Sequence, residues 1–151
     1  MQSILVRLVD RLPPRFRAFG TTGRIALLAQ FIRFGFVGVA GLVVDTATVY
    51  ALRGWLGLYG AGIAAYGTAA TFNWLLNRFW TFRGQGNGAA HKQWARYLVA
   101  NLAGFILNRG TYALMIYSLP SAAREPVLAT AAGALVGLGL NFHLSRRMVF
   151  R

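Results

Sequence analysis

Polar and charged side chains interrupt the most apolar parts of this 151-residue chain. Asp45 and Arg109 each lie inside a long apolar segment, and Asn73, Asn77 and Asn141 lie in or near others. Polar groups in hydrocarbon are costly, so their positions carry information about function. An amide both donates and accepts hydrogen bonds, which suits sugar hydroxyls, whereas an arginine binds phosphate through parallel N–H groups. The same amides can instead hold membrane helices together, so both interpretations stay open for each asparagine.

Four arginines follow the second and fourth apolar segments and could bind an anionic lipid head group: Arg78, Arg83, Arg146 and Arg147. Some of them are explained equally well by the positive-inside rule, since basic residues beside membrane helices determine the orientation of a chain. Arg78 and Arg146 rank first because an internal repeat, described below, places them at equivalent positions. Further amides, Asn101 and Asn108, lie in the third apolar segment.

Asp45 lies 12 residues after Arg33, and Arg109 lies 13 residues after Arg96. We therefore expect the two charges at nearly equal depth in the membrane. An ion pair between them is therefore permitted and would neutralise two buried charges. Alternatively, Arg109 contacts a lipid phosphate or a sugar while Asp45 restrains it, or Arg109 extends outward to the interface.

The chain has few residues for other chemistry, with no cysteine, three acidic residues and two histidines. Thiol nucleophiles, disulfides and cysteine-based metal sites are excluded. His91 and His143 have no second ligand at metal-binding spacing. We therefore expect no enzymatic activity, no metal and no cofactor. The sequence also contains no nucleotide-binding loop.

Composition indicates an all-α integral membrane protein. Hydrophobic residues make up 56% of the chain, which also contains 18 glycines. Long apolar segments occupy residues 34–52, 60–76, 97–119 and 126–144. A helix needs about 20 residues to cross a hydrocarbon core of about 30 Å. The sequence thus predicts four transmembrane helices, with turns over residues 53–59 and 120–125 and a polar loop over 83–95.

The net charge of +13 is distributed unevenly around these segments. Thirteen basic residues precede the first segment, surround the middle loop or follow the last segment, whereas only Arg53 and Arg124 lie on the other side. The positive-inside rule therefore predicts that both termini and the middle loop are cytoplasmic. Because the arginines punctuate apolar segments, we expect contact with anionic phospholipids and no nucleic-acid partner.

An internal repeat aligns residues 72–83 with residues 140–151. Asn73 matches Asn141, Arg78 matches Arg146, and the preceding segments also correspond, with Gly41 matching Gly104 and Asp45 matching Asn108. The repeat predicts two helical hairpins, about residues 31–83 and 94–151, in parallel orientation.

Three other patterns concern the membrane surface and helix packing. Residues 1–24 predict an amphipathic helix on the membrane surface, within a cytoplasmic segment covering residues 1–29. Gly133 and Gly137 form a GxxxG step that predicts close helix packing, either within the chain or in a homo-oligomer. Five aromatic residues near the cytoplasmic boundary predict an interfacial belt: Trp74, Trp80, Phe82, Trp94 and Tyr97.

The motifs of the chain follow in this order: Arg33-Phe34, then residues 73–82 (NWLLNRFWTF), a polar loop, and a second hairpin that closes on Asn141 and Arg146. In the order of these motifs the chain resembles the GtrA-like family of small four-span membrane proteins. The resemblance covers residues 30–151. It implies a bacterial-type cytoplasmic membrane and translocation of a polyprenyl-phosphate-linked monosaccharide for cell-surface polysaccharide synthesis. The site residues expected for this lipid are Arg78, Arg146, Arg109, Asn73, Asn77, Asn141, Asp45 and Arg83.

Two other functions compete with translocation. The chain could be a non-catalytic membrane partner that recruits a polyprenyl-phosphate glycosyltransferase, because a related module is fused to some of those enzymes. A small proton-coupled exporter is the weaker alternative, since Asp45 is its only candidate carboxylate.

Overall fold

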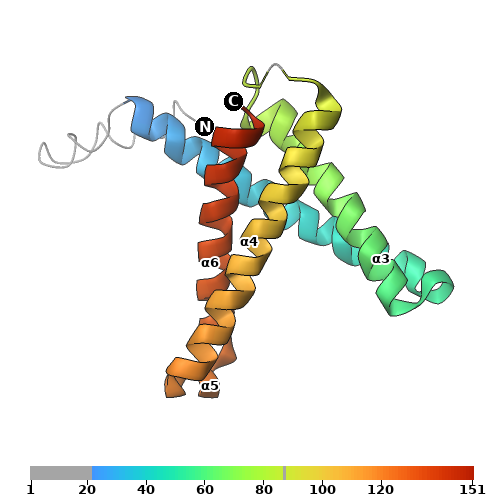
Figure 1. Cartoon of the computed structure of the whole chain (residues 1–151), viewed down its shortest axis with the longest axis vertical. Helices are drawn as coiled ribbons and strands as arrows, with labels where there is room; N and C mark the ends of the chain where they lie inside the picture. Colours follow the sequence, from blue (N-terminus) through green and yellow to red (C-terminus); the bar gives the residue numbers. More distant parts are fainter. Residues whose placement is uncertain (1–21, 87) are drawn as a thin grey trace, which may run out of the picture.

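The computed structural model describes residues 22–86 and 88–151, and all regular structure in these ranges is helical (Figure 1). Its elements, in chain order, are α3 (Thr22–Leu76), η1 (Asn77–Thr81), α4 (Ala90–Ser118), α5 (Pro120–Arg124), α6 (Pro126–Leu144) and η2 (Ser145–Val149). The predicted amphipathic helix covers residues 1–24. Residues 1–21 of it lie outside the described part of the chain. Residues 22–29, which the sequence assigned to that N-terminal segment, belong to the long helix α3.

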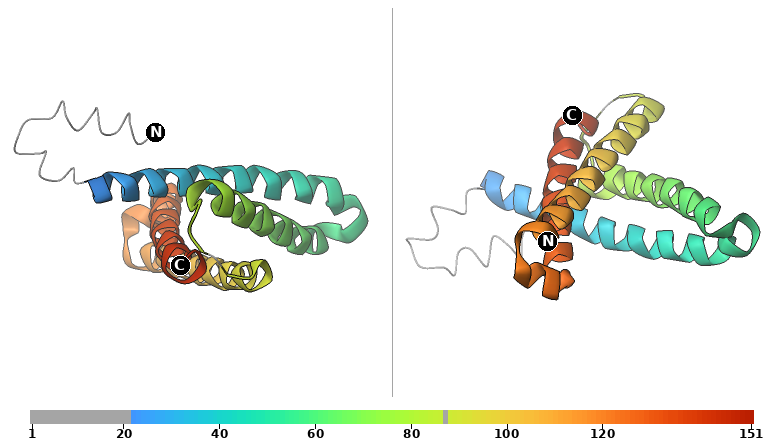
Figure 2. Two further views of the ribbon diagram at one scale, coloured as in Figure 1. Left: turned by 90° about the horizontal axis from the view of Figure 1, so that it is seen from above. Right: turned by 60° about the horizontal axis from the view of Figure 1, so that its bottom comes forward.

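Helix α3 bends sharply at Gly57, inside the turn predicted for residues 53–59. Gly57 has φ 66° and ψ 176°, a conformation that is essentially restricted to glycine. The bend divides α3 into a first arm, residues 22–56, and a second arm, residues 58–76. The second arm runs back beside the first (Figures 1 and 2), and Gly41 on one arm lies against Asn73 on the other.

Helices α4 and α6 pack against each other and are joined by the short helix α5, which occupies the predicted turn (Figure 1). Glycines allow a close approach at this contact. A Cβ atom on Gly133 would lie 2.6 Å from the backbone oxygen of Asn108, and one on Gly137 would lie 2.9 Å from that of Gly104. The GxxxG step therefore packs within the chain.

The core is an aromatic cluster where the two repeats meet. Phe82 and Phe150 occupy equivalent positions in the repeat and stack directly, with ring centroids 4.6 Å apart and planes inclined by 12°. Phe34 packs on Phe82 at 6.2 Å and 66°, and its counterpart Tyr97 packs on Phe150 at 6.2 Å and 65°. The repeat seen in the sequence is thus reproduced in the geometry, with Phe82 and Phe150 on its local axis.

The prediction of an interfacial aromatic belt is wrong for most of its members. Trp74, Phe82 and Tyr97 are buried, while Trp94 is partly buried and only Trp80 is largely exposed. Their rings fill the junction between the repeats because the helices cross there, and neighbouring polar groups satisfy the N–H and O–H groups.

Both repeats end in a π-helical turn at equivalent positions. The N–H of Phe82 donates to the carbonyl of Asn77 at 2.8 Å, and the N–H of Phe150 donates to that of Ser145 at 2.9 Å. The wider turn directs each terminal phenylalanine into the aromatic core.

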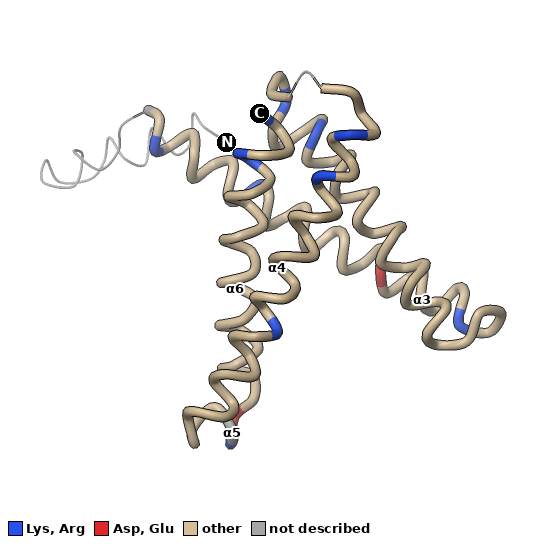
Figure 3. The backbone as a smooth tube through the Cα atoms, viewed as in Figure 1, with Lys and Arg blue, Asp and Glu red and all other residues tan. Residues whose placement is uncertain are grey.

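Two helical stretches are long and apolar enough to cross a membrane, Gly23–Thr81 and Pro126–Val149. Large apolar side chains cover the outside of the molecule, including Leu42, Val43 and Leu135, each about two-thirds exposed. Such a surface is typical of contact with lipid. Basic residues gather at the end that carries the C-terminus and the loop between η1 and α4 (Figure 3).

Candidate functional site

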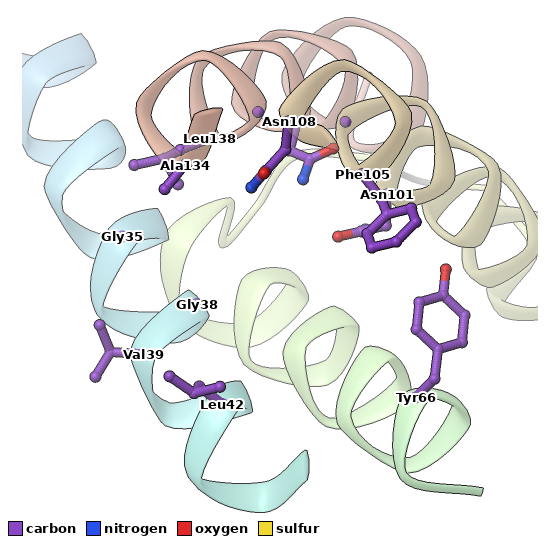
Figure 4. A pocket seen from close by; sticks show the side chains of 13 residues that line it. Gly35, Gly38, Val39, Leu42, Tyr66, Asn101, Phe105, Asn108, Ala134 and Leu138 are labelled. Atoms are coloured by element: carbon purple, nitrogen blue, oxygen red, sulfur yellow. The ribbon is translucent and has the colours of Figure 1, made fainter. Parts of the chain in front are cut away.

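A cleft of about 520 Å³ lies between the first arm of α3 and the packed helices α4 and α6 (Figure 4). Small residues create the space, because Gly35 and Gly38 face it from α3 and Gly104 and Gly137 face it from α4 and α6. Its polar lining comes from four side chains: Tyr66, Asn101, Asn108 and Asn141. In Figure 4 the side chains of Tyr66 and Asn101 extend toward the same space from opposite walls.

A second hollow of about 260 Å³ continues this cleft between the two arms of α3. The two share Gly38, Leu42, Tyr66 and Asn101 as lining residues, so together they form one polar cleft. The second hollow adds the side chains of Asp45 and Asn73.

Asn73 and Asn141 are the repeat-related pair in this polar cleft. A Cβ atom on Gly41 would collide with the Asn73 amide, and one on Gly104 would collide with the Asn141 amide. Each amide therefore occupies space that only glycine leaves free. The Oδ1 atoms of both asparagines are buried and have no hydrogen-bond partner among the described residues. A buried acceptor left unpaired costs about 1–3 kcal/mol, which a donor on a ligand could recover.

Asp45 and Arg109 are not paired in the structure. Asp45 lines the polar cleft from the first arm of α3. Arg109 is exposed on α4, with its guanidinium carbon 5.7 Å from the centroid of the Phe105 ring, and Phe105 itself lines the cleft. Arg109 therefore lies about one helical turn from the cleft opening, where it can meet a lipid phosphate.

Asn77 and Arg78 belong to a hydrogen-bonded network outside the cleft. The amide of Asn77 donates to the hydroxyl of Tyr97 at 3.0 Å. The buried Gln93 accepts from Nε1 of Trp74 at 3.2 Å and from the guanidinium of Arg78, which also lies over the Trp74 ring. Arg78 is thus braced in one orientation and keeps further N–H groups for an anion.

Arg146 and Arg83 lie at the basic end of the molecule and are exposed. Arg146 lines a separate hollow of about 600 Å³ together with Arg147, Met148 and Arg151. The predicted site residues therefore do not form one cluster. Asp45, Asn73 and Asn141 share the polar cleft, whereas the predicted arginines and Asn77 lie outside it.

Sequence reasoning missed Tyr66 as a lining residue of the cleft, and it named Asn101 and Asn108 only as further amides, not among the expected site residues. The alignment of Asn108 with Asp45 was a usable signal, because both positions hold a polar group at the same depth of the repeat. Tyr66 had no comparable signal, since a tyrosine in an apolar segment is equally typical of a lipid-facing position.

The chain matches the family model described as GtrA/DPMS, transmembrane domain, over residues 33–150. A comparison with proteins of curated function found no match. The matched range includes every residue that lines the polar cleft.

Proposed function

The chain belongs to the GtrA/DPMS transmembrane-domain family, and from this premise we propose that it translocates a polyprenyl-phosphate-linked monosaccharide across the membrane. Family membership supports a membrane process that involves polyprenyl-phosphate sugars. The polar cleft supports the finer assignment, because it offers hydrogen-bonding groups within otherwise apolar helices.

In this proposal the two arms of α3, α4 and α6 each cross a bacterial-type cytoplasmic membrane. The basic end, which carries the C-terminus and the loop between η1 and α4, faces the cytoplasm, as the distribution of arginines supports (Figure 3). In this proposal the N-terminus is cytoplasmic too. The polar cleft then lies within the hydrocarbon region, where a sugar could not pass unaided.

The single observation that carries the proposal is the pair of unpaired, buried amide oxygens on Asn73 and Asn141. Each amide packs against a glycine of the neighbouring helix, so it would have to turn toward the polar cleft before a sugar hydroxyl could donate to its oxygen. Tyr66 and Asp45 would supply further polar contacts along the polar cleft. Most of the isoprenoid chain stays in lipid, and arginines outside the cleft contact the phosphate. Because we expect no nucleotide site, net movement would follow the gradient of the lipid or the removal of product.

Reconstitution into vesicles tests this mechanism. With a polyprenyl-phosphate monosaccharide in one leaflet, we expect wild-type protein to expose the sugar faster than protein-free vesicles do. The double variant Asn73→Leu/Asn141→Leu should be at least about tenfold slower, the effect of losing one or two hydrogen bonds to the passing sugar. Its melting temperature should equal or exceed that of the wild type, because the substitution removes two unpaired buried groups.

Thr130→Val is the matched control, since the Thr130 hydroxyl is bonded to Pro126 within its own helix and lies outside the polar cleft. It should translocate like the wild type. Wild-type protein no faster than empty vesicles would refute translocation, and a fully active leucine variant would remove the cleft from the mechanism.

A second candidate function is anchoring of a polyprenyl-phosphate glycosyltransferase. The exposed hollow lined by Arg146, Arg147 and Arg151 favours it, since such a surface fits an acidic face of a soluble partner. Replacing these three arginines by glutamine should then abolish co-purification of the enzyme. Unchanged recovery of the enzyme would count against anchoring through this surface.

A further inference from the structure

The two repeats meet at two contacts, which we call seams. The polar seam joins the second arm of α3 to the start of α4. The apolar seam joins α6 to the start of α3. The internal repeat relates the two seams, because the first arm of α3 corresponds to α4 and the second arm corresponds to α6. A difference between the seams is therefore a departure from the symmetry of the molecule.

Side-chain hydrogen bonds hold the polar seam together. Trp94 donates from Nε1 to the hydroxyl of Thr71 at 3.1 Å. The other bonds of this seam are those described above, from Trp74 and Arg78 to Gln93 and from Asn77 to Tyr97. Opening this seam would break two buried and two partly buried hydrogen bonds together, each contributing about 0.5–1.5 kcal/mol and costing more if left unpaired.

The apolar seam lacks most of these donors and acceptors at the equivalent positions. Phe142 replaces Trp74, Phe31 replaces Trp94, Phe34 replaces Tyr97, and Gly139 replaces Thr71. The seam is held instead by edge-on aromatic contacts, Phe31 on Phe142 at 5.2 Å and Phe34 on Phe142 at 5.6 Å. Gln30 corresponds to Gln93, but the ring of Phe142 has no N–H to donate to it and Arg146 is exposed.

An apolar groove of about 280 Å³ follows the apolar seam and is lined by Leu27, Leu28, Phe31, Phe142 and Arg24. The same two helices line the polar cleft one turn further on, through Gly35 of α3 and Leu138 of α6. The groove and the cleft are thus successive openings along one seam. Arg24 is exposed and supplies a positive charge at the edge of the groove.

We propose that the apolar seam is the lateral passage for the prenyl chain of the lipid, with Arg24 contacting its phosphate, while the polar seam stays closed. This inference rests on the proposed function and names the route by which the lipid reaches the polar cleft. A prenyl chain exchanges one apolar contact for another when it separates Phe31 from Phe142, so entry there breaks no hydrogen bond. A polar edge and an apolar interior match the two chemical parts of a prenyl phosphate.

Photolabelling locates the chain independently of transport. Wild-type protein in vesicles of ordinary phospholipid is irradiated with a prenyl phosphate that carries a diazirine near the phosphate. We expect labelling at residues 24–31 and around Phe142, competed by unlabelled prenyl phosphate.

Arg24→Gln should reduce this labelling about tenfold, the effect of losing one hydrogen bond to a charged group. Arg53→Gln, at an exposed arginine outside the groove and the polar cleft, is the matched control and should have no effect. Labelling of the polar seam, or labelling that is not competed, would overturn the inference.

Cross-linking separates this inference from translocation itself. The chain has no native cysteine, so Phe31→Cys/Phe142→Cys can be joined selectively across the apolar seam by a short bis-methanethiosulfonate, which forms disulfides that a reductant cleaves. We expect transport to stop on joining and to return on reduction, whereas Thr71→Cys/Trp94→Cys, joined across the polar seam, remains active. Full activity with the apolar seam joined overturns the lateral passage but not translocation. Competed labelling at the apolar seam without wild-type transport refutes translocation and supports the seam as a lipid-binding site.

Discussion

Asn73 and Asn141 illustrate how much a residue pattern can indicate. Their equivalence is visible in the sequence, because each precedes an arginine by five residues. Asn73 and Asn77 also share a helical face, which suggested a common site. In the structure the two meet different helices, Asn73 facing the first arm of α3 and Asn77 facing α4. Which helix crosses at which turn depends on tertiary packing, and no local spacing contains that information.

The Asn77–Tyr97 hydrogen bond provides a prediction at this scale. Tyr97→Phe removes the acceptor of the buried Asn77 amide and should lower the unfolding free energy by about 1–3 kcal/mol. The double variant Asn77→Ser/Tyr97→Phe copies the pair Ser145 and Phe34 found at the equivalent positions of the other repeat. Its unfolding free energy should be about 1 kcal/mol higher than the value expected from adding the effects of the two single variants. Denaturant unfolding of the four proteins in detergent measures this coupling. Strict additivity would show that the hydrogen bond contributes no net stability.

At the scale of the helices, the bend at Gly57 should be intolerant of any side chain. Gly57→Ala forces an alanine into a backbone region that costs about 1–3 kcal/mol, and the melting temperature should fall accordingly. Gly54→Ala is the matched control, because a Cβ there has no neighbour within 4 Å and its φ is ordinary. It should be neutral or stabilising. Equal melting of the two variants would contradict the bend as described.

The packing of α4 on α6 gives a second prediction at this scale. A methyl group at Gly133 would meet the backbone of Asn108, which can move only with the whole of α4. Gly133→Ala should therefore destabilise the pair by about 1–3 kcal/mol, as overpacking does. Gly139→Ala on the same helix meets nothing within 4 Å and should be tolerated. Thermal unfolding in one detergent compares them directly. A Gly133 variant as stable as the Gly139 variant would show that the close approach is unnecessary.

The elements themselves were largely predictable, and their side-chain roles were less so. The bend at residues 53–59 follows from its break in apolar character and its glycines, and the break at Pro120 follows from proline chemistry. The burial of Trp74 was not predictable, because its partner Gln93 lies 19 residues away. A tryptophan near a membrane boundary is equally typical of an interface, and only the long-range partner distinguishes the two.

For the whole molecule, the distribution of arginines predicts an orientation that can be measured. Single cysteines at Gln85, Tyr59 and Ser121 introduce unique labels, because the chain has none of its own. With intact cells and an impermeant maleimide, Tyr59→Cys and Ser121→Cys should react from outside. Gln85→Cys should react only after permeabilisation. Outside reaction of all three, or of Gln85 alone, would refute the proposed crossings.

The overall shape was beyond sequence reasoning. Figure 1 shows the arms of α3 diverging from α4 and α6 away from the basic end. The space between them depends on the angles at which helices cross, which the glycine contacts and the aromatic core set together. Composition and charge could identify a membrane protein with a repeated unit. The polar cleft follows only when those crossing angles are known.

The stacking of Phe82 on Phe150 has a consequence for the origin of the chain. Residues from matching positions can touch face to face only near the axis that relates their two units. A half-length ancestor that paired with a copy of itself would have placed this phenylalanine against its own duplicate. Fusion of the two genes would then preserve the contact while freeing each half to diverge, which agrees with one junction having kept polar partners and the other aromatic ones.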